Sequence, residues 1–266
     1  MTSAIRAVTA GEIDFFAAHG WAYLPALVDP AWIDRLREIA VNRLRDVRRT
    51  PSAGVVDRAF GQDRDVAQFE PDFHRLTHHP SMGANAVHLL GTAERVRVQI
   101  SNLLVKEPAG AGRHSEATVY HQDFPWLPMD RSAMLTFWVA LAPVTAEMGS
   151  LRFFDKSNAL GLLGRSFVTD GDDIPTQHAW LTDQPVVGGY DLSPGDATVH
   201  HALTVHGAPK NSSSTARLSF TATYFDANAL YTGAPYSQTD QLSQKLEVNR
   251  PFEHPAYPIV GSEETR

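Results

Sequence analysis

The sequence has no cysteine, and this absence removes several kinds of chemistry at once. Disulfide bonds, thiolate metal ligands and a cysteine nucleophile are all excluded. Any metal ion must therefore be held by histidine, aspartate or glutamate side chains.

Long hydrophobic runs and an excess of positive charge are also missing. No apolar stretch is long enough to cross a bilayer, and the first residues contain no apolar segment of the kind a signal peptide needs. The net charge of −7 opposes general binding to nucleic acids or anionic lipids. The arginines between residues 35 and 49 are interpreted as a solvated helix face. We therefore expect a cytoplasmic protein that binds neither nucleic acid nor membranes.

What is present is an ordinary globular composition, 43% hydrophobic and 20% charged over 266 residues, and we expect one domain over 1–266. Thr9 and Glu12 form a capping box, and Asp29 precedes Pro30, so two helices are expected within about 9–50. Residues 51–81 are polar and irregular, which predicts a loop or lid.

From about 95 to 226 the hydrophobic pattern changes to a period of two. The runs ERVRVQI, AMLTFWVAL, ATVHHALTV and RLSFTATYF alternate or are apolar over strand length, with turn signals between them. Short strands after a pair of helices predict a mainly β fold with flanking helices, built as a double-sheet barrel or jelly roll.

Twelve histidines give many metal-like pairs, and two of them have a carboxylate two positions later. These are His121 with Asp123 and His114 with Glu116. On a strand, residues i and i+2 share a face, so either pair could bind one ion. His114 lies beside a glycine-rich segment, and the more rigid setting of His121 and Asp123 favours that pair. A third ligand should come from a distant strand, and His200, His201 and His206 are the candidates.

Arg217 starts an alternating strand in which Ser219, Thr221 and Thr223 lie on the same face. A buried guanidinium requires an anionic partner, and none is evident nearby in the sequence. A bound carboxylate is therefore a reasonable interpretation, with an ordinary salt bridge as the alternative.

Taken together, HQD at 121–123, a histidine in VHGAPKN and then RLSFTATY resemble the phytanoyl-CoA dioxygenase family of iron(II) and 2-oxoglutarate-dependent oxygenases. The segments DFFAAHGWAYLPAL, LTFWVALAPVTAEMGSLRFF and LSPGDATVHHALTVHGAPKN are similar to that family too. The resemblance runs from about Ile13 to Tyr224 and is weakest between 51 and 95.

This resemblance implies a double-stranded β-helix, the cupin-like jelly roll. It also implies Fe(II) bound by His121, Asp123 and His206, with 2-oxoglutarate and O2 as cosubstrates. The cosubstrate contacts that it implies are Arg217, Gln122, Trp138, Ser219 and Asn102. His201 stands where the family often has a histidine and is a candidate partner behind the metal ligands, while His200 is assigned no chemistry. For both, a buried structural histidine is the favoured interpretation.

Two positions depart from the family pattern, Ala208 in place of a serine and Asn158 in place of a histidine, and neither removes a metal ligand. Asp123 favours hydroxylation over halogenation, while desaturation and ring formation use the same ligands. The alternatives are a redox-inert zinc hydrolase and a non-catalytic sensor on the same fold. The expected substrate is a small molecule, natural-product-like, with determinants in 51–81 and 161–185. The sequence does not indicate the oligomeric state.

Overall fold

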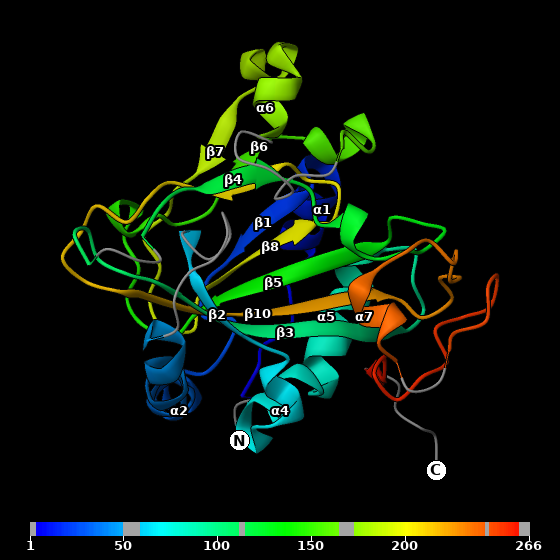
Figure 1. Cartoon of the computed structure of the whole chain (residues 1–266), viewed down its shortest axis with the longest axis horizontal. Coiled ribbons are helices and arrows are strands. Elements are labelled where there is room, and N and C mark those ends of the chain that lie inside the picture. Colours follow the sequence, from blue (N-terminus) through cyan, green and yellow to red (C-terminus); the bar gives the residue numbers. More distant parts are fainter. Residues whose placement is uncertain (1–3, 50–58, 112–114, 165–172, 243–244, 261–266) are drawn as a thin grey trace.

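Two antiparallel β-sheets face each other, and helices cover the outer side of the larger sheet (Figure 1). The structure is a computed structural model that describes residues 4–49, 59–111, 115–164, 173–242 and 245–260. Histidine 114, one of the alternative candidates, lies outside these residues. The mainly β, jelly-roll fold class expected from the sequence is confirmed.

The larger sheet has the strand order β1 (Trp21–Leu24), β8 (Ala197–His201), β5 (Met134–Ala140), β10 (Arg217–Asp226), β3 (Val96–Lys106) and β11 (Ile259–Val260), and β2 (Gly61–Arg64) also pairs with β3. The smaller sheet has the order β4 (Thr118–His121), β9 (His206–Ala208), β6 (Arg152–Phe154) and β7 (Val186–Gly188). Strands far apart in the sequence are neighbours in both sheets, so the fold brings distant side chains together.

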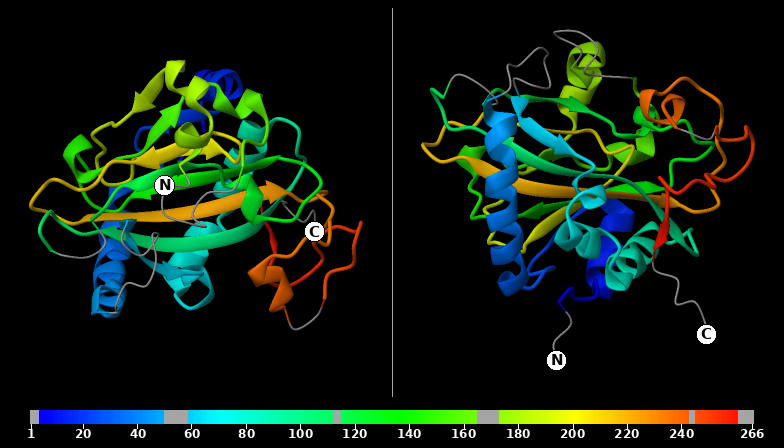
Figure 2. Two further views of the ribbon diagram at one scale, coloured as in Figure 1. Left: turned by 45° about the horizontal axis from the view of Figure 1, so that its top comes forward. Right: turned by 60° about the horizontal axis from the view of Figure 1, so that its bottom comes forward.

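The helices of the described residues are α1 (Ala10–His19), α2 (Pro30–Arg49), α4 (Pro71–Thr77), α5 (Pro80–Leu90), α6 (Ile174–Gln177) and α7 (Ser237–Asp240). Five short 3-10 turns accompany them: η1 (Val66–Gln68), η2 (Phe124–Trp126), η3 (Ala146–Met148), η4 (Ser157–Leu160) and η5 (Ala179–Asp183). Figure 2 shows α2, α4 and α5 on the side of the larger sheet that faces away from the smaller sheet. No helix in the described ranges has the length and apolar character needed to span a bilayer.

The amino-terminal helices begin at the predicted caps. Thr9 Oγ1 accepts from Glu12 N at 3.2 Å while Glu12 Oε2 accepts from Thr9 N at 2.7 Å. Asp29 Oδ1 accepts from Ala31 N at 2.8 Å, and Pro30 is the first residue of α2. Both sequence predictions are confirmed, because each side chain satisfies an N–H group that the first helical turn leaves free.

The prediction of an irregular 51–81 segment is wrong for its second half. Residues 50–58 lie outside the described part, but β2, η1 and α4 follow, and α5 begins at Pro80. The missed signals are Pro71 and Pro80, each at the first turn of a helix. Phe73 and Leu76 of α4 are fully buried against the sheet, so packing stabilises a helix too short to form alone.

Alternation along β10 separates a hydrophobic core from a polar cavity. Leu218, Phe220, Ala222 and Tyr224 face the helices in the main core. Residues 217, 219, 221 and 223 project from the opposite face, toward the smaller sheet, because successive strand residues point to opposite sides. The space between the two sheets is therefore lined by the polar face of the strand, as the sequence predicts.

Candidate metal and cosubstrate site

Two histidines and one aspartate converge between the sheets. The Nε2 atoms of His121 and His206 lie 3.5 and 3.7 Å from Asp123 Oδ1. The histidines come from the paired strands β4 and β9, where they are register partners, and Asp123 follows β4 directly. Ligand atoms of all three residues lie within 4.8 Å of one another, which leaves room for one ion between them.

Hydrogen bonds orient both imidazoles toward this point. His121 Nδ1 is 2.9 Å from Val119 O, and His206 Nδ1 is 2.9 Å from Thr204 O. Because a carbonyl oxygen only accepts, Nδ1 carries the proton and Nε2 presents its lone pair to the centre. Burial, together with His200 and His121, holds the pKa of His206 well below its ordinary value, so this imidazole is neutral and able to ligate.

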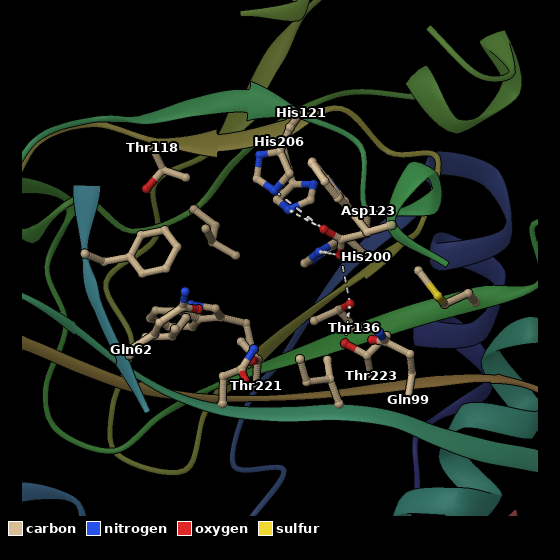
Figure 3. A pocket seen from close by; sticks show the side chains of 18 of the residues that line it. Gln62, Gln99, Thr118, His121, Asp123, Thr136, His200, His206, Thr221 and Thr223 are labelled. Carbon is tan, nitrogen blue, oxygen red and sulfur yellow. Dashed lines mark hydrogen bonds and ion pairs between the residues drawn. The ribbon is translucent and has the colours of Figure 1, made fainter. Parts of the chain in front are cut away.

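The other oxygen of Asp123 is held from behind. Thr136 Oγ1 donates to Asp123 Oδ2 at 2.9 Å, and His200 Nε2 lies 3.2 Å from the same atom. Figure 3 shows His200 and Thr136 on the larger-sheet side of Asp123, with His121 and His206 on the other. Burial opposes ionisation of Asp123, but the imidazoles of His206, His121 and His200 hold its pKa well below the ordinary value. Asp123 is therefore an oriented carboxylate with Oδ1 directed at the histidine pair.

This geometry corrects the structural interpretation of His200, whereas His201 is the structural histidine that the sequence favours. His200 contacts Asp123 and lines the cavity, whereas His201 Nδ1 accepts from Leu203 N at 3.1 Å. Burial, and secondarily His200, lowers the pKa of His201 to about 4, which is the behaviour of a neutral structural residue. The reason is strand parity, since Thr198 and His200 share the inner face of β8 and His201 does not.

Replacing His200 by phenylalanine is expected to weaken Fe(II) binding by about 10- to 100-fold, the range seen when an outer partner of a metal ligand is lost. Phenylalanine keeps a ring beside His206, whose centroid lies 3.9 Å from that of His200, but cannot hold Asp123 Oδ2. Anaerobic competition with a chelator measures the affinity. His200→Gln, which keeps a donor, should recover part of it, and His201→Asn serves as the neighbouring control. An unchanged affinity in His200→Phe would contradict the positioning role.

Arg217 lies deeper in the same cavity with no carboxylate partner among the described residues. Its side chain is 2% exposed, and Nη1 donates to Gly149 O. Burial lowers its pKa to about 9, so the guanidinium still carries its charge at neutral pH. Its carbon atom Cζ lies 5.2 Å from the centre of the Trp138 ring, a cation–π arrangement.

Three buried polar atoms around Arg217 have no hydrogen-bond partner in the described structure: Arg217 Nε, Trp138 Nε1 and Ser219 Oγ. Such groups cost free energy unless a ligand or water satisfies them. Two of them are donors and the third is a hydroxyl, so together they fit a bound carboxylate. The residues at this end of the cavity therefore suit a carboxylic acid such as 2-oxoglutarate.

The remaining two predicted contacts behave differently. Asn102 lines the cavity from β3, and its Oδ1 accepts from Asp65 N at 3.4 Å. Gln122 does not reach the cavity: its Nε2 donates to Gly161 O and Leu203 O, and its Oε1 accepts from Leu163 N, all within 2.8 Å. The Gln122 amide therefore links residues 121–123 to the loop that contains Gly161 and Leu163 and to the loop that contains Leu203. These hydrogen bonds direct the amide away from a bound cosubstrate.

Replacing Gln122 by methionine is expected to lower the free energy of unfolding by about 2–3 kcal/mol, because three main-chain groups lose their partner. The 2-oxoglutarate affinity should change less than the stability. Urea denaturation measures the first quantity and calorimetric titration the second. The exposed Gln68, replaced in the same way, is the control. A large loss of 2-oxoglutarate affinity at unchanged stability would contradict this structural role.

Several cavity residues were not foreseen from the sequence. They are Phe60, Gln62, Gln99, Thr118, Thr136 and Tyr236. Thr136 could have been found by parity, since it lies two residues before Trp138 on β5. Tyr236 and Gln62 could not, because each comes from a segment outside the expected strand core and reaches the cavity through tertiary packing.

A jelly roll with two histidines and a carboxylate facing its interior defines a non-haem iron oxygenase, and a carboxylate anchor beside it marks the 2-oxoglutarate-dependent class. The phytanoyl-CoA dioxygenase family model matches residues 16–219, and the chain belongs to this family. It is a non-haem Fe(II)- and 2-oxoglutarate-dependent oxygenase, as the sequence predicts. No curated protein sequence matches the chain.

Among the solved structures similar to this chain are two enzymes from nogalamycin biosynthesis. The non-haem alpha-ketoglutarate-dependent carbocyclase SnoK from nogalamycin biosynthesis is 27% identical, with a TM-score of 0.78 over 95% of this chain and 96% of that one. The epimerase SnoN, in complex with Fe3+, alpha-ketoglutarate and nogalamycin RO, is 27% identical, with a TM-score of 0.76 over 94% and 97%. EctD from S. alaskensis, with 2-oxoglutarate and 5-hydroxyectoine, is 20% identical (TM-score 0.65, 83% and 77% covered) and shows the shared fold.

Proposed function

We propose that His121, Asp123 and His206 hold Fe(II), and that Arg217, with Trp138 and Ser219 beside it, anchors 2-oxoglutarate. The observation that carries this proposal is the pairing of an oriented two-histidine, one-carboxylate site with a buried guanidinium that has no protein carboxylate partner in the described residues. A zinc hydrolase would have no use for such an anchor. Iron bound there supplies dioxygen activation coupled to the oxidative decarboxylation of 2-oxoglutarate to succinate and CO2.

The chain's own residues prepare this chemistry. Thr136 and His200 fix the orientation of Asp123, and the main-chain carbonyl groups of Val119 and Thr204 fix the tautomers of the two histidines. Arg217 is buried between the sheets, where exclusion of water strengthens its attraction for a carboxylate.

The substrate that we propose is an uncharged, ring-bearing small molecule of the secondary-metabolite type, which is hydroxylated, desaturated or cyclised. Apart from the three histidines, the acidic and basic side chains among the described lining residues are Asp123 and Arg217, and both have a role already. An acyl-CoA thioester would need further cations for its phosphates. The cavity lining instead includes Trp126, Met134 and Tyr236. Figure 3 shows the polar side chains of Gln99 and Thr223 close together on the larger-sheet side of the cavity.

SnoK and SnoN support this substrate class, because both belong to the biosynthesis of the natural product nogalamycin and SnoN binds nogalamycin RO.

Anaerobic titration of the Fe(II) protein with 2-oxoglutarate tests the cofactor assignment. A visible metal-to-ligand charge-transfer band is expected, and its absence would overturn the assignment. Aerobic succinate formation is then compared between neutral aromatic polyketides and acyl-CoA thioesters. Stimulation by the acyl-CoA compounds alone would overturn the proposed substrate class.

A further inference from the structure

Lys106, the last residue of β3, is a fully buried basic residue that no sequence pattern singles out. Its Nζ donates to Glu116 O at 2.8 Å, to Pro209 O at 3.0 Å and to Thr118 Oγ1 at 3.1 Å. The side chain is 0% exposed, and the described residues place no carboxylate in ion-pair contact with it. Burying a charge in this way is costly unless an opposite charge is supplied.

Lys106 and Arg217 are register partners on the adjacent strands β3 and β10. Two buried basic side chains therefore lie side by side, and among the described residues neither forms an ion pair with a protein carboxylate. Arg217 makes the charged form of Lys106 less favourable and is one of the groups that lower the pKa of Lys106. A pair of like charges of this kind indicates a site for an anion that approaches both.

Thr118 connects Lys106 to the cavity. Thr118 lines the cavity from β4 (Figure 3). Its hydroxyl also accepts a hydrogen bond from Lys106 Nζ. A hydroxyl has one hydrogen to donate and two positions to accept. When Lys106 is an ammonium, it occupies an accepting position of Thr118, and the hydroxyl hydrogen is free to point into the cavity. When Lys106 is a neutral amine, its lone pair takes that hydrogen instead.

We propose that Lys106 is a second cation for the distal carboxylate of 2-oxoglutarate, acting through Thr118, and that it takes up a proton from solvent when this ligand binds. The inference rests on the proposed function and adds a residue to its cosubstrate anchor. Lys106 is a positioning residue, because Thr118 rather than Lys106 faces the ligand.

The proton balance follows from the surroundings of Lys106. Burial and then Arg217 lower its pKa to about 6, and Glu116 opposes this shift. The other described neighbours are main-chain or uncharged groups: Pro209 O, Thr118 and Gly149, where an added Cβ would lie 3.3 Å from Lys106 Cδ. Above pH 6 the empty site therefore holds mostly the amine. A bound dianion raises the pKa of Lys106, so binding consumes a proton.

The affinity for 2-oxoglutarate should therefore fall as the pH rises. Affinity for 2-oxoglutarate is fully present below pH 6, and above it falls by up to about tenfold per pH unit until the pH passes the pKa of the bound state. A 2-oxo acid without a distal carboxylate places no negative charge near Arg217 and Thr118. Its affinity should therefore lack this pH dependence.

Calorimetric titration of the anaerobic Fe(II) protein tests the proposal. At pH 7.5, in two buffers of different ionisation enthalpy, the heats give the number of protons taken up with 2-oxoglutarate and with 2-oxobutyrate. We expect 2-oxoglutarate to take up nearly one proton more than 2-oxobutyrate. Using the second ligand as a reference cancels protons exchanged at the metal ligands, because both acids bind iron through the same 2-oxo acid group.

Two variants locate the proton. Lys106→Met should abolish the extra uptake and flatten the pH dependence. Thr118→Val keeps Lys106 but removes the hydroxyl, and it should weaken 2-oxoglutarate binding while sparing 2-oxobutyrate. Thr77→Val, a buried threonine of α4 on the far side of the larger sheet, is the matched control and should change neither.

The outcomes separate the inference from the function on which it rests. Equal proton uptake for the two acids in the wild-type protein, or an unchanged pH dependence in Lys106→Met, would overturn the role of Lys106 and leave the oxygenase assignment intact. Failure of the wild-type protein to bind 2-oxoglutarate at any pH would overturn the proposed cosubstrate site itself. If Lys106→Met does not fold, equal uptake in the wild-type protein still overturns the proposal, and so does unchanged 2-oxoglutarate affinity in Thr118→Val.

Discussion

Replacing Asp123 by alanine is expected to abolish hydroxylating turnover and to reduce Fe(II) affinity by more than the roughly 100-fold that loss of an outer partner can cause. Asp123 Oδ1 faces both histidine Nε2 atoms at 3.5 and 3.7 Å, so it is the anionic donor of the site. Its removal leaves two neutral imidazoles, which bind a divalent ion far less tightly. Substrate-dependent succinate release and anaerobic metal competition measure the two effects.

The control is Asp183→Ala, which removes an exposed carboxylate from η5 and should behave like the wild-type protein. Thermal unfolding of the metal-free proteins shows whether Asp123→Ala remains folded. Hydroxylation retained at a wild-type rate by Asp123→Ala would show that another carboxylate serves the metal.

Replacing Arg217 by methionine is expected to weaken 2-oxoglutarate binding by at least about 100-fold, because breaking a buried charge pair costs about 3–5 kcal/mol. Methionine fills most of the space over Trp138 but offers no donor to a carboxylate. The charge-transfer band of the anaerobic Fe(II) protein gives the 2-oxoglutarate concentration needed for half saturation. A full-strength band at the low 2-oxoglutarate concentrations that saturate the wild-type protein would contradict the assignment.

Two controls accompany this test: a ligand that lacks the distal carboxylate, and replacement of a second buried arginine. Binding of 2-oxobutyrate, which lacks the distal carboxylate, should change little in Arg217→Met. Arg97 is also buried, but its Nη1 donates to Tyr257 O at 2.9 Å and fastens the carboxyl-terminal segment. Arg97→Met should therefore lower stability while leaving the 2-oxoglutarate affinity unchanged.

The strand core of the fold was predictable because its signal is local. A period of two in the sequence forces alternate side chains to opposite faces of a sheet. The face shared by Arg217, Thr221 and Thr223 could therefore be inferred before any contact was known, and these residues do line the cavity. The helix starts at Thr9 and Pro30 were predictable for the same reason, since a cap acts on residues a few positions away.

Elements that are stabilised by contacts with distant residues were harder to predict from the sequence. The helix α4 has seven residues and forms where Phe73 meets Phe220 of β10, at 5.0 Å between ring centroids. Nothing within residues 71–77 indicates that partner. The same limit applies to Tyr236, which reaches the cavity from the segment after the strand core.

The chain order of His121, Asp123, His206 and Arg217, together with the alternation of the strands around them, was sufficient by itself to determine the family, the fold and the chemistry to expect. Only the tertiary structure decided which of the adjacent histidines His200 and His201 holds Asp123, that Gln122 turns away from the cavity, and that Lys106 lies beside Arg217. The candidate metal ligands and the candidate carboxylate anchor follow from residue type and order along the chain. The orientation of a carboxylate and the cost of a buried charge depend on neighbours that strand pairing brings together across a hundred residues or more, as Lys106 and Arg217 illustrate.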